Sequence, residues 1–156
     1  MIDSRRLLAI GLTTALLLGP VQAHGVKRGA VEIVHPWTHA GANVGDDAAV
    51  YMVVKVAAPK GDRLKGASSP IAGSVELHVL DNVAGTHRTK RVSAFEIGAR
   101  GRLEMTTTGP RLILKQIKKP LSAFDTFAMT LEFERAGRIE VEVLVEDATM
   151  VSPPKH

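Results

Sequence analysis

Residues 127–146, FAMTLEFERAGRIEVEVLVE, decide the fold of this chain. In the first part, 127–134, large apolar side chains alternate with small, hydroxyl or acidic ones, which is the period of a strand with one face in the core. A turn at Arg135, Ala136 and Gly137 follows, and in 139–146 the apolar Ile139, Val141, Val143 and Val145 alternate with Glu140, Glu142, Leu144 and Glu146. The stretch therefore predicts an antiparallel hairpin with one buried and one solvated face.

The rest of the chain is also dominated by period-two segments, and no stretch keeps a helical period for three turns. The further candidate strands are 30–35, 48–57, 63–67, 74–80, 87–97, 102–107 and 110–116. Gly, Pro, Asp and Asn separate these segments. Many short strands between such turns predict an all-β sandwich or barrel in one domain.

The N-terminal residues have the features of an export signal. Arg5 and Arg6 precede the apolar run LLAIGLTTALLLG, and Val21-Gln22-Ala23 resembles a cleavage site. We therefore expect a signal peptide over 1–23, a domain over 24–147 and a flexible tail over 148–156. The apolar run is too short for a comfortable membrane span, and an uncleaved N-terminal anchor is the alternative. Export places the mature protein in the periplasm.

Composition excludes several kinds of site. The chain has no cysteine, which excludes disulfides, thiolate metal sites, cysteine nucleophiles and a cysteine-linked lipid anchor. Removal of 1–23 leaves 18 of 20 Lys and Arg and 15 of 16 Asp and Glu, a net charge of 18 − 15 = +3. The basic clusters contain no aromatic residues for base stacking, so we expect no nucleic-acid partner. No catalytic constellation is visible, which indicates a binding protein and not an enzyme.

Three segments carry a resemblance to a known family, the periplasmic PCuAC copper chaperones. They are EIVHPWTHAGANVGDDAAVYMVV at 32–54, DRLKGASSPIAGSVELHVL at 62–80 and LKQIKKPLSAFDTFAMTLEFERAGRIEVEVLV at 114–145. The resemblance implies a cupredoxin-like Greek-key β-sandwich that binds copper as Cu(I). It also implies a monomer that delivers copper toward the copper A centre of cytochrome oxidase, with a copper-receiving oxidase assembly protein as partner.

The family's copper site follows a spaced pattern of His, then Met after ten residues, then His-any-Met after twenty-one more. Thioethers and imidazoles suit Cu(I), which explains that ligand set. Counted from His78, the remaining positions are occupied by Thr89, Arg111 and Ile113. The resemblance thus leaves His78 as the surviving ligand of a degenerate motif and implies a weak or altered copper site. A copper-independent paralogue that binds a protein partner or a small anion near Arg111 is the alternative.

Two other histidines are candidate metal ligands. His87 lies two residues before Thr89 and shares its face on an extended strand, so it could offer a second imidazole to His78. The alternative is a histidine in a basic, solvated strand. His24 becomes the first residue after cleavage at Ala23, and its amine and ring nitrogen together would chelate Cu(II). With a second imidazole it would form a histidine brace. The protein would then be a copper redox enzyme, which is a further alternative to the copper-chaperone interpretation.

Other residues of metal-binding type are interpreted as structural. Pro36 is expected to end its strand and Trp37 to be a core or turn aromatic. Met52, Met105 and Met129 lie among aliphatic neighbours in predicted strands and are expected to fill the core.

Overall fold

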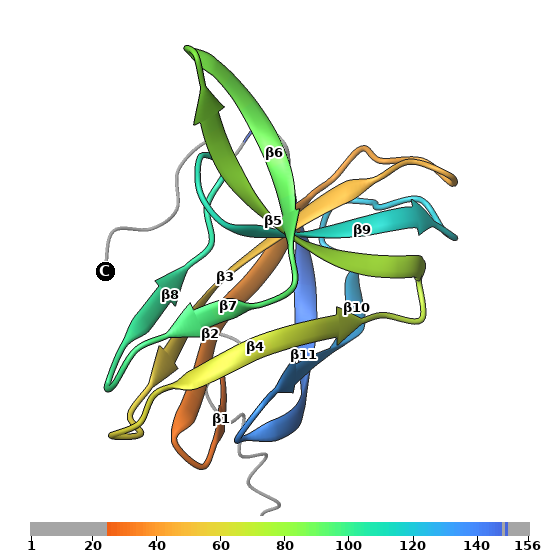
Figure 1. Ribbon diagram of the computed structural model, residues 1–156. Coiled ribbons are helices and arrows are strands. Elements are labelled where there is room, and N and C mark those ends of the chain that lie inside the picture. The colour runs from red at the N-terminus through yellow and green to blue at the C-terminus, as the bar shows by residue number, and fades with distance from the viewer. Residues whose placement is uncertain (1–24, 148, 150–156) are drawn as a thin grey trace, which may run out of the picture.

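Eleven β-strands and no helix occur in the computed structural model, which describes residues 25–147 and 149 (Figure 1). The strands are β1 (Gly25–Arg28), β2 (Val31–His39), β3 (Ala48–Val56), β4 (Asp62–Ser68), β5 (Ala72–Val83), β6 (Thr86–Val92), β7 (Phe95–Ile97), β8 (Arg102–Glu104), β9 (Arg111–Ile117), β10 (Thr126–Phe133) and β11 (Gly137–Glu146). Within this described part no helix is long and apolar enough to cross a membrane. The predicted signal peptide, His24 and nearly all of the predicted tail lie outside the described residues.

The strands follow one hydrogen-bonded path in the order β6-β5-β9-β3-β2-β11-β10-β4-β7, with β1 beside β2 and β8 beside β3. Only the β11–β2 ladder is parallel among the pairs of the described chain. The path folds over so that β4, β10 and β11 face the layer that contains β3, β5 and β9, and the β5–β6 hairpin projects beyond both (Figure 1). The predicted all-β sandwich is confirmed.

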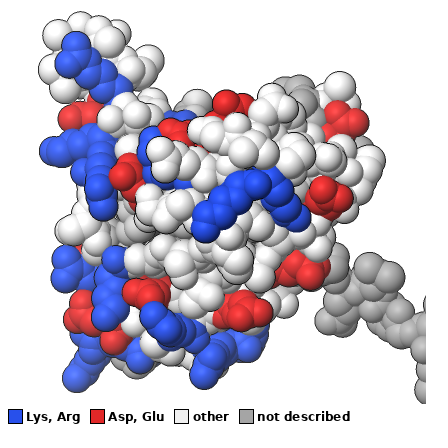
Figure 2. Space-filling model, turned by 90° about the vertical axis from the view of Figure 1, so that its right-hand side faces the viewer, with Lys and Arg blue, Asp and Glu red and all other residues white. Residues whose placement is uncertain are grey.

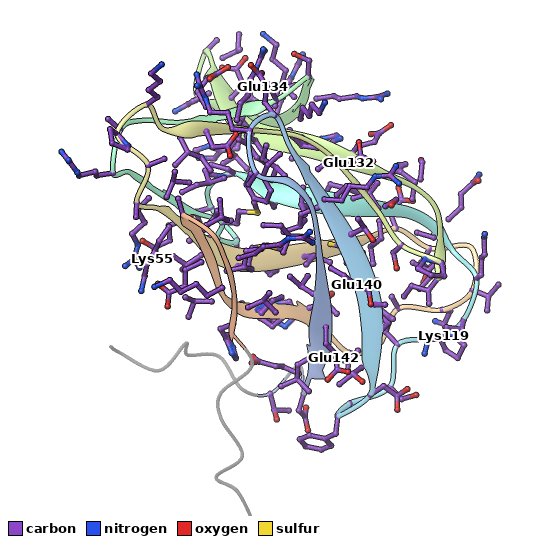
Figure 3. The ribbon with its side chains drawn as sticks, turned by 90° about the horizontal axis from the view of Figure 1, so that it is seen from below. Lys55, Lys119, Glu132, Glu134, Glu140 and Glu142 are labelled. Carbon is purple, nitrogen blue, oxygen red and sulfur yellow. The ribbon has the colours of Figure 1, made fainter. Side chains whose placement is uncertain are left out.

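The β10–β11 hairpin has the predicted arrangement. Its ladder runs from Thr126 opposite Leu144 to Phe133 opposite Gly137, where a positive φ of 76° suits glycine. The inward residues of both strands are buried in the core: Phe127, Met129, Leu131, Phe133, Ile139, Val141, Val143 and Val145. The labelled glutamates of these strands lie on the outside (Figure 3). Each large apolar side chain buried here contributes about 1.5–3 kcal/mol.

The three methionines of the predicted strands fill the core. Met52, Met105 and Met129 are 1%, 3% and 0% exposed and belong to the main apolar cluster. Their thioethers are therefore packed among hydrocarbon side chains, as the sequence predicts.

Strand β2 differs from its prediction, because it does not end at residue 35 or at Pro36 but continues to His39. A β-bulge lies between Val34 and Trp37, and His35 has a left-handed backbone with φ of 49°. The expectation failed because the extra residue of a bulge lets a strand pass a proline without losing its ladder.

The bulge reverses the alternation of inward and outward residues. Before it, Ile33 is buried, whereas after it Thr38 is buried and Trp37 takes the outer face opposite Tyr51. Trp37 was expected in the core or a turn, and the phase change is the reason for the difference.

The predicted strand 87–97 is two strands that belong to different layers. β6 pairs with β5, while β7 pairs with β4 on the far side of the sandwich. The short β1 was not predicted, since its four residues carry no period-two pattern.

Candidate functional site

Strands β5, β6 and β9 bring the four motif positions onto one outer face. His78 lies directly opposite Arg111, Glu76 opposite Ile113, and Leu80 opposite Thr89. These side chains point outward because the intervening Leu77, Leu112 and Leu114 are buried in the core. Directly opposed residues in an antiparallel pair have Cβ atoms about 4.5–5.5 Å apart, so Arg111 is a close neighbour of His78.

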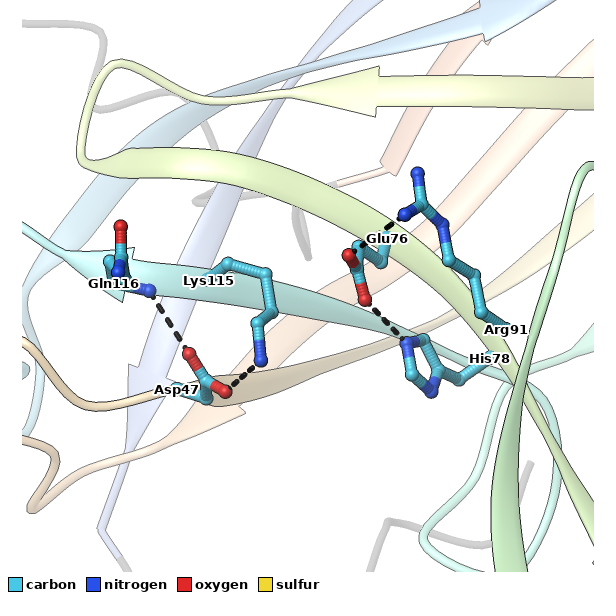
Figure 4. A network of polar contacts seen from close by, with 6 residues as sticks. All are labelled: Asp47, Glu76, His78, Arg91, Lys115 and Gln116. Carbon is cyan, nitrogen blue, oxygen red and sulfur yellow. Dashed lines mark hydrogen bonds and ion pairs between the residues drawn. The ribbon is translucent and has the colours of Figure 1, made fainter.

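His78 is held by a carboxylate on its own strand. Its Nε2 is 2.8 Å from Glu76 Oε2, and the other oxygen, Oε1, lies 3.1 Å from Arg91 Nη1 (Figure 4). The hydrogen bond from His78, followed by the charge of Arg91, holds the pKa of Glu76 below its usual value. Glu76 is therefore ionised at neutral pH and accepts hydrogen bonds only, so His78 Nε2 is the donor of this pair.

A second ion pair lies farther along the same face. Lys115 donates to Asp47 Oδ2, and the backbone N–H of Gln116 donates to Oδ1 at 3.0 Å (Figure 4). The bond from Lys115, and then that from Gln116, lowers the pKa of Asp47, while Asp47 raises the pKa of Lys115. The carboxylates of Glu76 and Asp47 are thus ionised and have their oxygens engaged.

Arg111 has unusual surroundings for a cation. Its Nε and Nη2 atoms are buried without a hydrogen-bond partner among the described residues, and so is Nδ1 of His78. Tyr51 follows Val50, the last β3 residue paired with β9, and comes next to Arg111. Burial raises the pKa of the Tyr51 phenol, and the nearby guanidinium opposes that rise. The motif position that would hold an imidazole therefore holds a fixed, partly buried positive charge.

An aromatic cluster adjoins Arg111. The ring of Trp37 lies 4.7 Å from that of Tyr51 and 4.8 Å from that of His39, the latter edge to face. His35 Nε2 lies 2.7 Å from Glu146 Oε1 at the end of the cluster. These residues reach the outer face only because of the bulge in β2, so period-two reasoning missed Trp37 as part of this surface.

His87 does not join His78, and His24 lies outside the described residues. His87 is exposed and lies opposite Asn82, four residues along β5 from His78, a distance of about 13 Å along a strand. Thr89 is also exposed. No cluster of three or more His, Asp or Glu side chains suited to a metal ion occurs within residues 25–147 and 149. Glu76 was not predicted, although its position two residues before His78 on one strand face could have revealed it.

On the face shown in Figure 2, basic and acidic side chains are interspersed. The projecting β5–β6 hairpin carries Arg88, Lys90 and Arg91 on its exposed strand. The predicted solvated basic strand agrees with this distribution.

Comparisons with known proteins identify the family. The model of the LpqE-like family matches residues 31–145. Among solved structures, the copper-bound PCuAC domain from PmoF2 is 31% identical with a TM-score of 0.69, over 80% of this chain and 98% of that domain. The apo form of the same domain is 29% identical with a TM-score of 0.68, over 81% and 97%.

A more distant structure shares the fold. The apo-DR1885 protein from Deinococcus radiodurans is 24% identical with a TM-score of 0.59, over 96% of this chain and 98% of that one. A comparison with curated protein sequences found no match. On the family match and the whole-domain similarity to PmoF2, the chain belongs to the LpqE-like family and to the PCuAC fold family.

Proposed function

We propose that this protein is an exported, copper-chaperone-like binding protein whose copper site is weak and altered. Its likeness to a copper-bound PCuAC domain over nearly the whole of that domain supports the copper-handling role. The observation that carries the altered site is the register that puts Arg111 directly opposite His78. The proposed location is the periplasm, and the proposed partner is a copper-receiving oxidase assembly protein.

Three physical effects weaken Cu(I) at these positions. Ile113 offers no lone pair, and the hydroxyl of Thr89 is a hard ligand that Cu(I) does not favour. Arg111 cannot lose its charge, and at ~4 Å with an effective dielectric constant of ~20 it repels a monovalent cation by about 4 kcal/mol. His78 alone does not offset this repulsion.

Competition between the protein and a Cu(I) chelator tests the proposal. We expect the mature chain to bind Cu(I) and to lose it to a chelator of modest affinity. His78→Ala should remove this binding, and the matched His87→Ala variant, on the exposed strand opposite Asn82, should retain it. Copper retained against a strong chelator would contradict a weak site. Equal binding by wild type and His78→Ala would contradict the assignment of His78.

His24 needs its own control, because it would bind Cu(II) through the N-terminal amine. A chain that begins at His24 is compared with the same chain acetylated at its N-terminus, which removes the amine as a ligand. Loss of Cu(II) binding on acetylation identifies the amine chelate, while Cu(I) binding at His78 should be the same in both chains. Equal Cu(II) binding by both chains would exclude a chelate that uses the N-terminal amine.

A further inference from the structure

We propose that Arg111 and His78 together bind a small oxyanion that carries a hydroxyl group, of which bicarbonate is the smallest common example. The observation is a set of three buried nitrogen atoms without hydrogen-bond partners: Nε and Nη2 of Arg111 and Nδ1 of His78. The two residues lie directly opposite each other in the β5–β9 ladder. Unpaired buried polar groups are costly, and three of them on two directly opposed residues favour a ligand that pairs them.

The two unpartnered nitrogens of Arg111 form one edge of the guanidinium. Nε–H and Nη2–H point in parallel along this edge, and their spacing matches two oxygen atoms of one planar oxyanion. A guanidinium is also weakly hydrated, which favours such pairing in a partly buried position. The edge therefore selects an anion that presents two acceptor oxygens side by side.

His78 selects the hydroxyl. Its Nε2–H is donated to the ionised carboxylate of Glu76 at 2.8 Å, so in the neutral imidazole Nδ1 is an acceptor. An acceptor beside a bound anion requires a donor from that anion. Bicarbonate supplies two acceptor oxygens to Arg111 and one O–H to His78, whereas formate and acetate have no such hydroxyl.

Neither Glu76 nor Asp47 pairs with Arg111. Glu76 uses one oxygen for His78 and the other for Arg91. Asp47 uses its oxygens for Lys115 and for the backbone of Gln116. The buried position of the three nitrogens further restricts the ligand to an ion of few atoms.

NMR titration of the metal-free mature protein at pH 8 tests the proposal. The probe is the Nε–H resonance of Arg111, identified by its loss in Arg111→Lys. Sodium bicarbonate, acetate and chloride are added at constant ionic strength, and thermal unfolding is followed in parallel. We expect a saturable bicarbonate shift of this resonance and an affinity at least tenfold higher for bicarbonate than for acetate.

Matched variants separate the site from general charge effects. Arg111→Lys keeps the charge but loses the two-donor edge, so its affinity for bicarbonate should be at least tenfold lower than that of wild type. Arg138→Lys makes the same change at an arginine on β11 whose side chain is 77% exposed and should leave binding unchanged. If Arg111→Lys does not fold, the resonance is assigned through the bonds of the Arg111 side chain in isotope-labelled wild-type protein, and the wild-type titration carries the test.

Three results would overturn the proposal: a shift that does not saturate or that chloride reproduces, equal affinity for acetate and bicarbonate, or unchanged affinity in Arg111→Lys. The proposal goes beyond the copper role and does not depend on it. Because the titration uses metal-free protein, its failure is distinguishable from failure of the copper experiment.

Discussion

Arg111 lies directly opposite His78 in the antiparallel ladder between β9 and β5, with both side chains on the outer face of the sheet. A permanent cation thus adjoins the imidazole that the family motif would assign to copper. The imidazole in turn donates a hydrogen bond from Nε2 to Glu76, and its Nδ1 has no partner among the described residues. The local chemistry of this face is therefore organised around a guanidinium, and this arrangement leads to specific expectations.

Restoring the motif should restore copper affinity. The triple variant Thr89→Met, Arg111→His, Ile113→Met returns the soft ligands and removes a repulsion of about 4 kcal/mol, which corresponds to roughly a thousandfold in affinity. Competition with a Cu(I) chelator measures the change. The double variant Thr89→Met, Ile113→Met keeps Arg111 and should remain a weak binder. A triple variant no tighter than wild type would show that these positions do not form a site.

Acid should destabilise the protein through Glu76. Its folded-state pKa is lowered, chiefly by the hydrogen bond from His78, so its contribution to stability is present above the pKa of the unfolded chain. The contribution is lost as the pH falls through the lower, folded-state pKa. Glu76→Gln should therefore flatten the fall in melting temperature below about pH 5.

The matched control for this pH profile is Glu142→Gln, which changes an exposed glutamate on the outside of β11. Its profile should follow that of wild type. Identical acid profiles for wild type and Glu76→Gln would mean that the pair with His78 contributes nothing to stability.

Asp62 should be among the most sensitive polar residues. Its buried carboxylate accepts hydrogen bonds from the backbone N–H groups of Arg63, Arg135 and Ala136 at 2.7, 2.9 and 2.9 Å. Asp62→Ala leaves these donors unpaired and should lower the free energy of unfolding by about 3 kcal/mol in urea denaturation. Asp62→Asn keeps one acceptor oxygen and should cost about half as much. A loss below 1 kcal/mol for Asp62→Ala would contradict this role.

The left-handed backbone at His35 predicts an order of stabilities among its substitutions. With φ of 49°, glycine fits without steric cost, while a β-branched side chain is strained. His35→Val should therefore be less stable than His35→Gly by about 1–2 kcal/mol. Both variants lose the contact with Glu146, so that loss does not enter the comparison between them. Equal stabilities would indicate that the bulge relaxes in one of them.

Local patterns in the sequence were sufficient for most of the fold. The β10–β11 hairpin follows from uninterrupted alternation between a buried and a solvated face, and its ladder keeps that phase throughout. Strand β2 could not be predicted in the same way, because periodicity assumes a constant phase and a bulge changes it. The division of 87–97 into β6 and β7 also lacked a signal, since no Gly or Pro marks the break.

The site could be predicted only in part. Spacing within the resemblance identified His78, Thr89, Arg111 and Ile113, and the register brings these positions onto one face. The proximity of Tyr51 to Arg111 depends on the pairing of β3 with β9, strands about sixty residues apart in the chain, which local patterns do not reveal. The proposed partnership of His78 with His87 does not agree with the register, because a hairpin fixes which residues meet.

The bulge in β2 changes which positions of the strand face the interior. Before His35 the inward residues are Val31 and Ile33, whereas beyond it they are Pro36 and Thr38, and Trp37 and His39 form the outward set. Deleting one residue at the bulge would exchange the two sets and turn Trp37 toward the interior. Chain length at this point therefore decides which positions can acquire new chemistry without disturbing the fold.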